Sequence, residues 1–179
     1  MVESGIPPFK WAPGFAETLA EIANNWAHIE FAMNQSIWIL SGLSSEAGAC
    51  ITSQIFTLQG RLAAVKSLLE FVEAPKPLLK QVNKFSENVR GATEKRNRAL
   101  HDMWLVDISD ENIMARMEIT APGHLRFEPK PHDLLKIQND LAVVNAARKE
   151  AFAIRNAIQQ LPTLPARSKS IRDPMESTY

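Results

Sequence analysis

Residues 13–41, PGFAETLAEIANNWAHIEFAMNQSIWILS, decide the fold of this chain. Their large apolar residues recur at steps of three and four, the spacing that places side chains on one face of an α-helix. The stripe consists of Phe15, Leu19, Ile22, Trp26, Ile29, Met33, Ile37 and Leu40. We therefore predict a long amphipathic helix from about Pro13 to Ser41, with this stripe facing a core.

A second helix is predicted after Gly42, which interrupts the stripe. Ser44 or Ser45 is its expected N-cap, with Glu46 in the first turn, where a negative charge is favourable. Prolines at positions 75 and 77 stop this helix. Its apolar stripe consists of Ile51, Ile55, Leu58, Leu62, Val65 and Leu69.

The third helix, a β insert and a fourth helix complete the predicted fold. The third helix begins near Leu78, and its apolar face carries Val82, Phe85, Val89 and Ala92. Beyond Met103 the period changes, and we predict three short strands at 104–108, 113–120 and 124–128. Turn-forming residues separate these strands, as in an antiparallel meander.

The fourth helix opens at Pro131-His132-Asp133 and ends at Pro162. Its stripe consists of Leu134, Ile137, Leu141, Val144, Ala151 and Ile158. The predicted fold is mainly α, a four-helix bundle with a small antiparallel β insert between helices three and four. We divide the chain into an N-terminal lead at 1–12, a helical domain at 13–161 with the insert at about 103–128, and a flexible tail at 162–179.

Charge and cysteine content exclude several classes of protein. Twenty basic side chains balance twenty acidic ones, so any site for a polyanion must be local. The only cysteine, Cys50, excludes an internal disulfide and a multi-cysteine zinc site, and we predict a buried thiol. No segment is typical of a secretory signal or a membrane span. We expect a cytoplasmic protein without membrane association.

Neither a metal nor a cofactor is predicted. His28, His124 and His132 lack ligand spacing on a helix, so we place the first on a helix face and the other two in loops. Residues 107–111 are acidic, but they lack the glycine and the terminal glutamate of a calcium loop. The tryptophans are expected to anchor a core or an interface, and they are Trp11, Trp26, Trp38 and Trp104.

The chemically suggestive segment is Arg96-Asn97-Arg98-Ala99-Leu100-His101, late in the third helix. On an ideal helix Arg96 lies about 20° from the azimuth of the apolar stripe, which directs a guanidinium inward. A charge there is costly without a partner. The partner is either an inward carboxylate such as Glu30 or Glu17, or an anionic ligand in a cleft, because the guanidinium fork binds carboxylate and phosphate alike.

His101 is the second element of this segment. It lies about 140° around the helix from Arg96, so the two converge only if the helix ends or bends, or if two copies meet about a dyad. Asn97, four residues before His101, lies beside it and can orient the imidazole. Arg98 and Asp102 are spaced for a surface ion pair.

The local charge favours an anion site. Five basic residues against Glu87 and Glu94 give a net charge of plus three. These basic residues are Lys84, Arg90, Lys95, Arg96 and Arg98. Phosphate is the expected guest, and Lys95, Arg98 and Arg90 are candidate substrate-binding residues.

The Arg96-Asn97-x-x-x-His101 pattern resembles the signature of the HEPN superfamily. The resemblance implies a four-helix bundle, a homodimer, and a motif late in the third main helix that faces its copy across a cleft. Many members are metal-independent endoribonucleases of toxin–antitoxin, abortive-infection and CRISPR-linked defence systems, and others bind nucleotides or have lost activity. The implied partners are therefore a second copy, RNA or a nucleotide, and a cognate antitoxin protein.

The resemblance also implies residue roles. Arg96 would hold the scissile phosphate, His101 would act as general base or acid, and Asn97 would orient either His101 or the phosphate, with no metal. Two other classes remain open on the sequence, namely a non-catalytic dimeric helical module that binds a nucleotide or a protein, and a helical scaffold in which Arg96 is ion-paired.

Overall fold

The computed structural model describes residues 10–106, 114–120 and 126–162. The described residues form five helices and a three-stranded antiparallel sheet, so the chain is mainly helical. The elements are α1 (Phe15–Ser41), α2 (Ser45–Thr52), α3 (Leu58–Phe71), α4 (Lys76–His101), β1 (Trp104–Val106), β2 (Met114–Thr120), β3 (Arg126–His132) and α5 (Leu134–Gln159). Within the described ranges every helix is too short or too polar to span a bilayer.

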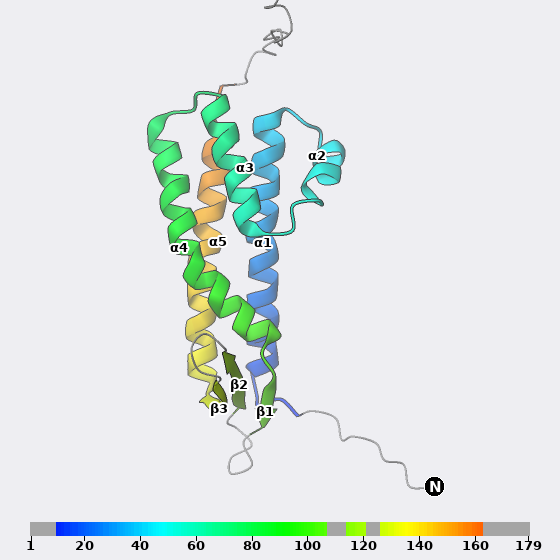
Figure 1. Cartoon of the computed structure of the whole chain (residues 1–179), viewed down its shortest axis with the longest axis vertical. Helices are drawn as coiled ribbons and strands as arrows, with labels where there is room; N and C mark the ends of the chain where they lie inside the picture. The colour runs from blue at the N-terminus through cyan, green and yellow to red at the C-terminus, as the bar shows by residue number, and fades with distance from the viewer. Residues whose placement is uncertain (1–9, 107–113, 121–125, 163–179) are drawn as a thin grey trace, which may run out of the picture.

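The core lies among α1, α3, α4 and α5, which run along the long axis of the molecule with the sheet at one end (Figure 1). The whole predicted stripe of α1 is buried, from Phe15 to Leu40. The predicted faces of the later helices are buried as well, including Val82, Phe85 and Val89 of α4. Removing this apolar surface from water is the main force that assembles the helices.

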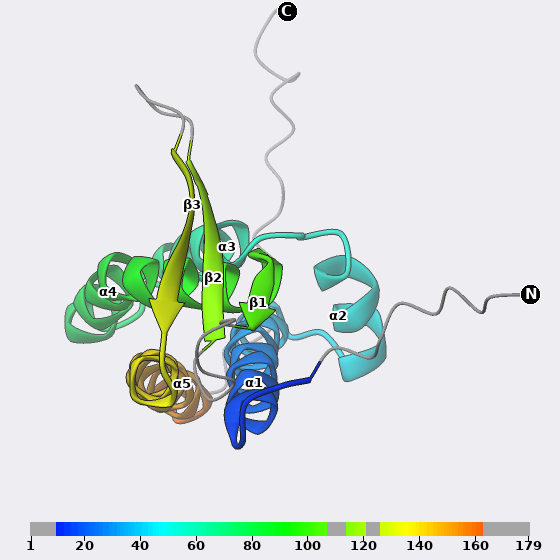
Figure 2. The same ribbon diagram turned by 90° about the horizontal axis from the view of Figure 1, so that it is seen from below.

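The second predicted helix is wrong as a single element, because the structure divides it into α2 and α3. Thr57 leaves the helical conformation and its side-chain oxygen accepts a hydrogen bond from the Gly60 backbone N–H, so it caps a new helix. α2 instead lies against α1, on the opposite side of the molecule from α4 and α5 (Figure 2). Ile51, assigned to a buried stripe, is therefore 51% exposed.

Trp38 holds α2 against α1. Its Nε1 donates a hydrogen bond to Thr52 Oγ1 over 3.1 Å, and the backbone of Gly48 lies directly against its indole ring. The predicted burial of Cys50 is wrong, because α2 buries only Gly48 and Thr52 and leaves the thiol exposed. Trp26 and Trp104 are buried as expected, Trp38 is half-buried, and Trp11 is exposed.

The sheet has the order β1-β2-β3, and its third strand is longer than predicted. β3 runs to His132, so the insert does not end at 128, and His132 lies in a strand rather than in a loop. Prolines 129 and 131 are tolerated because β3 is an edge strand. The proline nitrogens can face away from β2, so their lack of an N–H does not remove a hydrogen bond from the sheet. α5 then begins at Leu134, capped by Asp133, whose side chain accepts from the Lys136 backbone N–H.

The register of the sheet sets which side chains share a face. Arg116 of β2 pairs with Lys130 of β3, and Met114 pairs with His132 two positions away. Because alternate residues of a strand point to the same side, these four side chains share one face of the sheet. Trp104 of β1 joins this face to α4, since its Nε1 donates a 2.9 Å hydrogen bond to the Ala99 carbonyl.

Candidate functional site

Arg96, Asn97 and His101 come together at the C-terminal end of α4. A guanidinium nitrogen of Arg96 (Nη1) donates to Asn97 Oδ1 over 2.9 Å and lies 3.1 Å from His101 Nε2. The two side chains meet within one chain at the end of α4, whose last residue is His101, which is one of the conditions that the sequence analysis set for their convergence. The 140° azimuth describes Cα positions, whereas the guanidinium lies at the end of a long side chain that reaches along the helix surface.

The contact between Arg96 and His101 is compatible with one tautomer of the imidazole. A guanidinium can only donate hydrogen bonds, so a hydrogen bond across this contact needs a lone pair on His101 Nε2. The tautomer that supplies it carries its proton on Nδ1. A neutral imidazole with an open lone pair is the form that removes a proton from a hydroxyl group.

Arg96 packs on an aromatic ring instead of a carboxylate. Its Cζ lies 5.6 Å from the ring centroid of Trp26, a buried residue of α1, at a distance typical of a cation–π contact. The alternative pairing with Glu30 is wrong, because Glu30 accepts from Trp26 Nε1 over 3.2 Å and lies 3.7 Å from Arg61.

No carboxylate within the described ranges lies at ion-pair distance from Arg96, so Glu17 is not its partner either. The Nε of Arg96 is buried and has no hydrogen-bond partner among these residues. Asn97 and His101 are exposed, and Arg96 is half-buried. The guanidinium is thus held in place by a ring and by its contacts with Asn97 and His101, without a carboxylate of the described residues to neutralise it.

The three predicted substrate-binding residues lie in two hollows on either side of α4. The first, which we call the α3–α4 hollow, has a volume of about 570 Å³ and is lined by Arg90, Asn97 and Arg98, with Gln59 from the start of α3. Arg98 donates to Glu94 over 3.1 Å, and both residues also line the second hollow. The predicted pair of Arg98 with Asp102 stays a prediction, and Asp102 lies 3.3 Å from Arg116.

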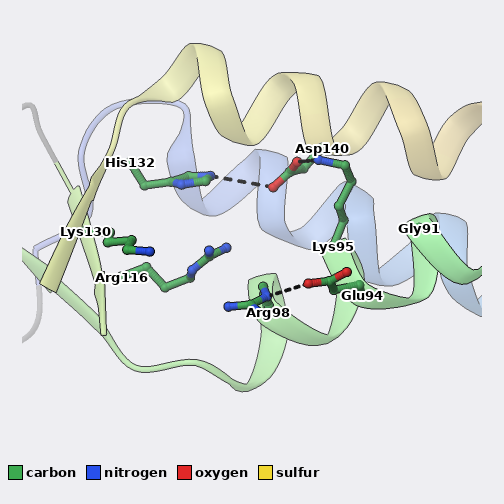
Figure 3. Close-up of a pocket in the computed structure, with 8 residues that line it drawn as sticks. All are labelled: Gly91, Glu94, Lys95, Arg98, Arg116, Lys130, His132 and Asp140. Carbon is green, nitrogen blue, oxygen red and sulfur yellow. Dashed lines mark hydrogen bonds and ion pairs between the residues drawn. The ribbon is translucent and has the colours of Figure 1, made fainter. Parts of the chain in front are cut away.

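The second hollow, which we call the α4–sheet hollow, has a volume of about 400 Å³. Lys95 and Arg98 enter it from α4, and Arg116, Lys130 and His132 enter it from β2 and β3 (Figure 3). Asp140 of α5 closes its far side. Lys95, a predicted substrate-binding residue, donates a hydrogen bond to Asp140.

Asp140 is the electrostatic centre of the α4–sheet hollow. It is 6% exposed, hydrogen-bonded by Lys95, and its Oδ2 lies 3.6 Å from His132 Nε2, beyond ordinary hydrogen-bond length. Burial alone would raise the pKa of Asp140, but its interactions with His132 and Lys95 outweigh burial and hold that pKa below its ordinary value. The carboxylate therefore stays ionised and keeps both basic groups in place.

Sequence reasoning missed His132, Arg116 and Asp140. The available signal was the alternation of Arg116 and Lys130 with apolar and proline residues in two strands, which places polar residues on one sheet face. Asp140 interrupts the apolar spacing of α5 between Ile137 and Val144 and is buried with them. A buried acid in such a stripe implies a basic partner.

Other candidate ligands do not gather. His28 lies on the exposed face of α1, as predicted, with its ring 6.1 Å from that of Phe152. His124 and residues 107–111 lie outside the described residues. Within the described parts of the chain, no group of three or more histidine, cysteine, aspartate or glutamate side chains is arranged to hold a metal ion.

Comparison of the chain with protein-family models, with curated proteins and with solved structures found no match. The geometry of the two α4 sites is therefore the basis for assigning a function to the chain.

Proposed function

We propose that this chain is a HEPN-like, metal-independent endoribonuclease that cleaves RNA with Arg96, Asn97 and His101. The carrying observation is the convergence of these three side chains at the exposed end of α4, with Arg96 unpaired by any carboxylate of the described residues. In this proposal α1, α3, α4 and α5 correspond to the four helices of the bundle, and α2 and the sheet are additions.

The reaction is attack of a ribose 2′-oxygen on the adjacent phosphorus. The free lone pair of His101 Nε2 takes the 2′-hydroxyl proton, the new P–O2′ bond forms, and the P–O5′ bond breaks. The products are a 2′,3′-cyclic phosphate and a 5′-hydroxyl, whose oxygen receives a proton from a general acid. Atoms and charges balance without water, a metal or an oxidant.

Arg96 has two roles in this mechanism. While it donates to His101 it orients the imidazole, and when RNA binds its fork turns to the scissile phosphate and stabilises the charge that develops on the oxygens. The Trp26 ring keeps the guanidinium close to the reaction centre during this exchange. Asn97 supports the same geometry through its bond to Arg96.

A second copy of the chain is the proposed source of the general acid. One His101 cannot hold and release a proton at two oxygens on opposite sides of the phosphorus, so a dimer that brings two motifs together completes the site. Met103 is 53% exposed two residues after His101, which leaves apolar surface beside the cluster for such a contact. The α3–α4 hollow, with Arg90 and Arg98, provides basic surface next to Asn97 for the flanking RNA backbone.

The test is RNA cleavage by the purified full chain in the presence of a chelator. We expect cleavage with cyclic-phosphate ends by the wild type, and a loss of at least about a hundredfold in Arg96→Ala and in His101→Ala. His28→Ala and Arg148→Ala remove a histidine and an arginine that lie outside the proposed site, on α1 and α5, and should leave cleavage unchanged. Equal cleavage by all five proteins refutes the mechanism, and RNA or nucleotide binding without turnover supports the non-catalytic binding module instead.

A further inference from the structure

The α4–sheet hollow has the features of an anion site that is separate from the Arg96 cluster. It contains two arginines and two lysines against two carboxylates, Glu94 and Asp140, a net charge of plus two without the histidine. Its volume of about 400 Å³ lies within the range of small-molecule pockets and exceeds what a bare phosphate requires. The ligand class that matches clustered guanidinium and ammonium groups is a phosphate ester.

Two of the basic groups of this hollow, Arg116 and His132, are built into the fold and are largely shielded from solvent. The side chains of Arg116 and His132 are each 12% exposed, and that of Asp140 is 9% exposed. Arg116 comes from the middle of β2 and His132 from the end of β3, on the same sheet face. Burying charged groups is costly, so a hollow lined with them is typical of a site that binds an ion.

Two buried nitrogen atoms of the hollow have no hydrogen-bond partner among the described residues. They are Nε of Arg116 and Nε2 of His132. Arg116 Nε lies 3.3 Å from Asp102 Oδ2, but the geometry makes an ion pair without a hydrogen bond. His132 Nε2 likewise lies 3.6 Å from Asp140 Oδ2 without a hydrogen bond. Buried polar groups in native proteins are nearly always hydrogen-bonded, so ion-paired groups that lack a hydrogen bond in the wall of a pocket are consistent with a ligand site.

A phosphate in this hollow would compete with the carboxylates that pair with its rim cations, and these carboxylates are easily displaced. Glu94 pairs with Arg98 and Glu128 with Lys130 at 3.1 and 3.9 Å, and the two glutamate side chains are 67% and 58% exposed. Exposed ion pairs contribute little free energy, so a phosphate can replace these glutamates at small cost. Asp140, in contrast, is buried and holds Lys95 and His132 in position.

We propose that the α4–sheet hollow binds the phosphate group of a small phosphomonoester, with Arg116, Lys130 and Arg98 as its ligands. Arg116 binds the phosphate from the floor of the hollow, and Lys130 and Arg98 bind it from the rim. Asp140 is a positioning residue that acts through Lys95 and His132. The organic part of the ester occupies the remaining volume.

The test is isothermal titration calorimetry of the full chain with AMP, with adenosine as the probe that lacks the phosphate, and with inorganic phosphate. We expect AMP and phosphate to bind and adenosine not to bind. Arg116→Gln should weaken AMP binding at least about tenfold, the effect of losing one charge-assisted hydrogen bond. Lys130→Gln should weaken AMP binding several-fold. Because the lysine side chain is 43% exposed, this variant should fold normally, and it provides the test if Arg116→Gln does not fold.

Arg148→Gln is the matched control, because Arg148 lies on α5 and lines neither of the two α4 hollows. It should bind AMP as the wild type does, and so should Arg96→Ala, which separates this site from the proposed cleavage site. The proposal is overturned if millimolar AMP and phosphate do not bind, if adenosine binds as well as AMP, or if Lys130→Gln binds AMP as tightly as the wild type does.

Discussion

Gly48→Ala tests how α2 is held against α1. A Cβ built on Gly48 would lie 2.7 Å from Nε1 of Trp38 and closer still to two carbons of the same ring. Real Cβ atoms essentially never show contacts under 3.0 Å, so the indole must move. That movement should break or lengthen the 3.1 Å hydrogen bond from Trp38 Nε1 to Thr52 Oγ1, and it should disturb the edge contact between the rings of Trp38 and Phe31.

The expected change in the free energy of unfolding of Gly48→Ala is the sum of one stabilising and two destabilising contributions. Alanine is favoured over glycine inside a helix by about 1 kcal/mol. Overpacking a closed contact costs about 1–3 kcal/mol, and the broken hydrogen bond costs about 1 kcal/mol more. The free energy of unfolding should therefore fall by about 1–3 kcal/mol, which lowers Tm by roughly 2 to 12 °C in a chain of this size.

Gly91→Ala is the matched control for this substitution. Gly91 lies inside α4, and a Cβ added there meets nothing within 4 Å. The helix gain is then unopposed, and Tm should rise by about 2 to 4 °C. Urea and thermal unfolding followed by far-UV circular dichroism measure both variants. If Gly48→Ala matches or exceeds the wild type in stability, the contact between Trp38 and α2 described above is wrong.

Three further predictions follow from the packing and charge of the described residues. Arg96→Lys keeps the charge but loses the planar fork and its stacking on Trp26, so kcat/KM for RNA should fall about tenfold or more, and undiminished cleavage would contradict the role of the fork. Asp140 has a lowered pKa, so it stabilises the fold above its unfolded pKa and loses this effect as the pH falls through its folded pKa. Asp140→Asn should accordingly be less stable than the wild type at pH 7, with the difference shrinking below about pH 4 in urea titrations, and a constant difference would exclude this linkage. Met114→Ala empties a fully buried position between Val106 and His132 and should lower the free energy of unfolding by about 2–5 kcal/mol, against less than 1 kcal/mol for the exposed Met103→Ala.

The two α4 sites share a short length of helix. Arg96 turns toward Trp26 of α1, while its sequence neighbour Lys95 bonds Asp140 of α5. Glu94 and Arg98 form the wall that the two hollows have in common. A ligand in one hollow therefore contacts the same helical turns that carry the proposed cleavage residues.

The helix prediction was accurate where the apolar stripe is buried in the core and inaccurate where part of the stripe is exposed. In α1 every third or fourth residue faces the core, so periodicity alone located the helix from Phe15 to Ser41. Between Ser44 and Leu69 the same periodicity continued through the break between α2 and α3, because Ile51 of α2 kept the spacing while lying on the surface. Spacing does not report whether an apolar residue has anything to pack against.

The candidate site divides in the same way. The sequence singled out Arg96, Asn97 and His101 by residue type and position. A charged residue on the apolar stripe of a helix is unusual, and this can be recognised from the sequence alone. It did not identify their contact, since the reach of a flexible side chain is not encoded in the azimuth of its Cα. It also missed the α4–sheet hollow, whose members come from α4, β2, β3 and α5 and approach one another only after the sheet has packed on the helices.

By itself, the sequence determined several local features: the helix that ends at Ser41, the opening of α5 after Pro131-His132-Asp133, and the basic end of α4. These depend on residues within a few positions of one another, for which hydrogen bonding and periodicity are sufficient. Only the tertiary structure decided that Arg96 packs on Trp26 rather than pairing with Glu30, and that His132 faces Asp140. Such contacts join residues far apart in the chain, and burial and charge pairing select among them only when the whole core closes.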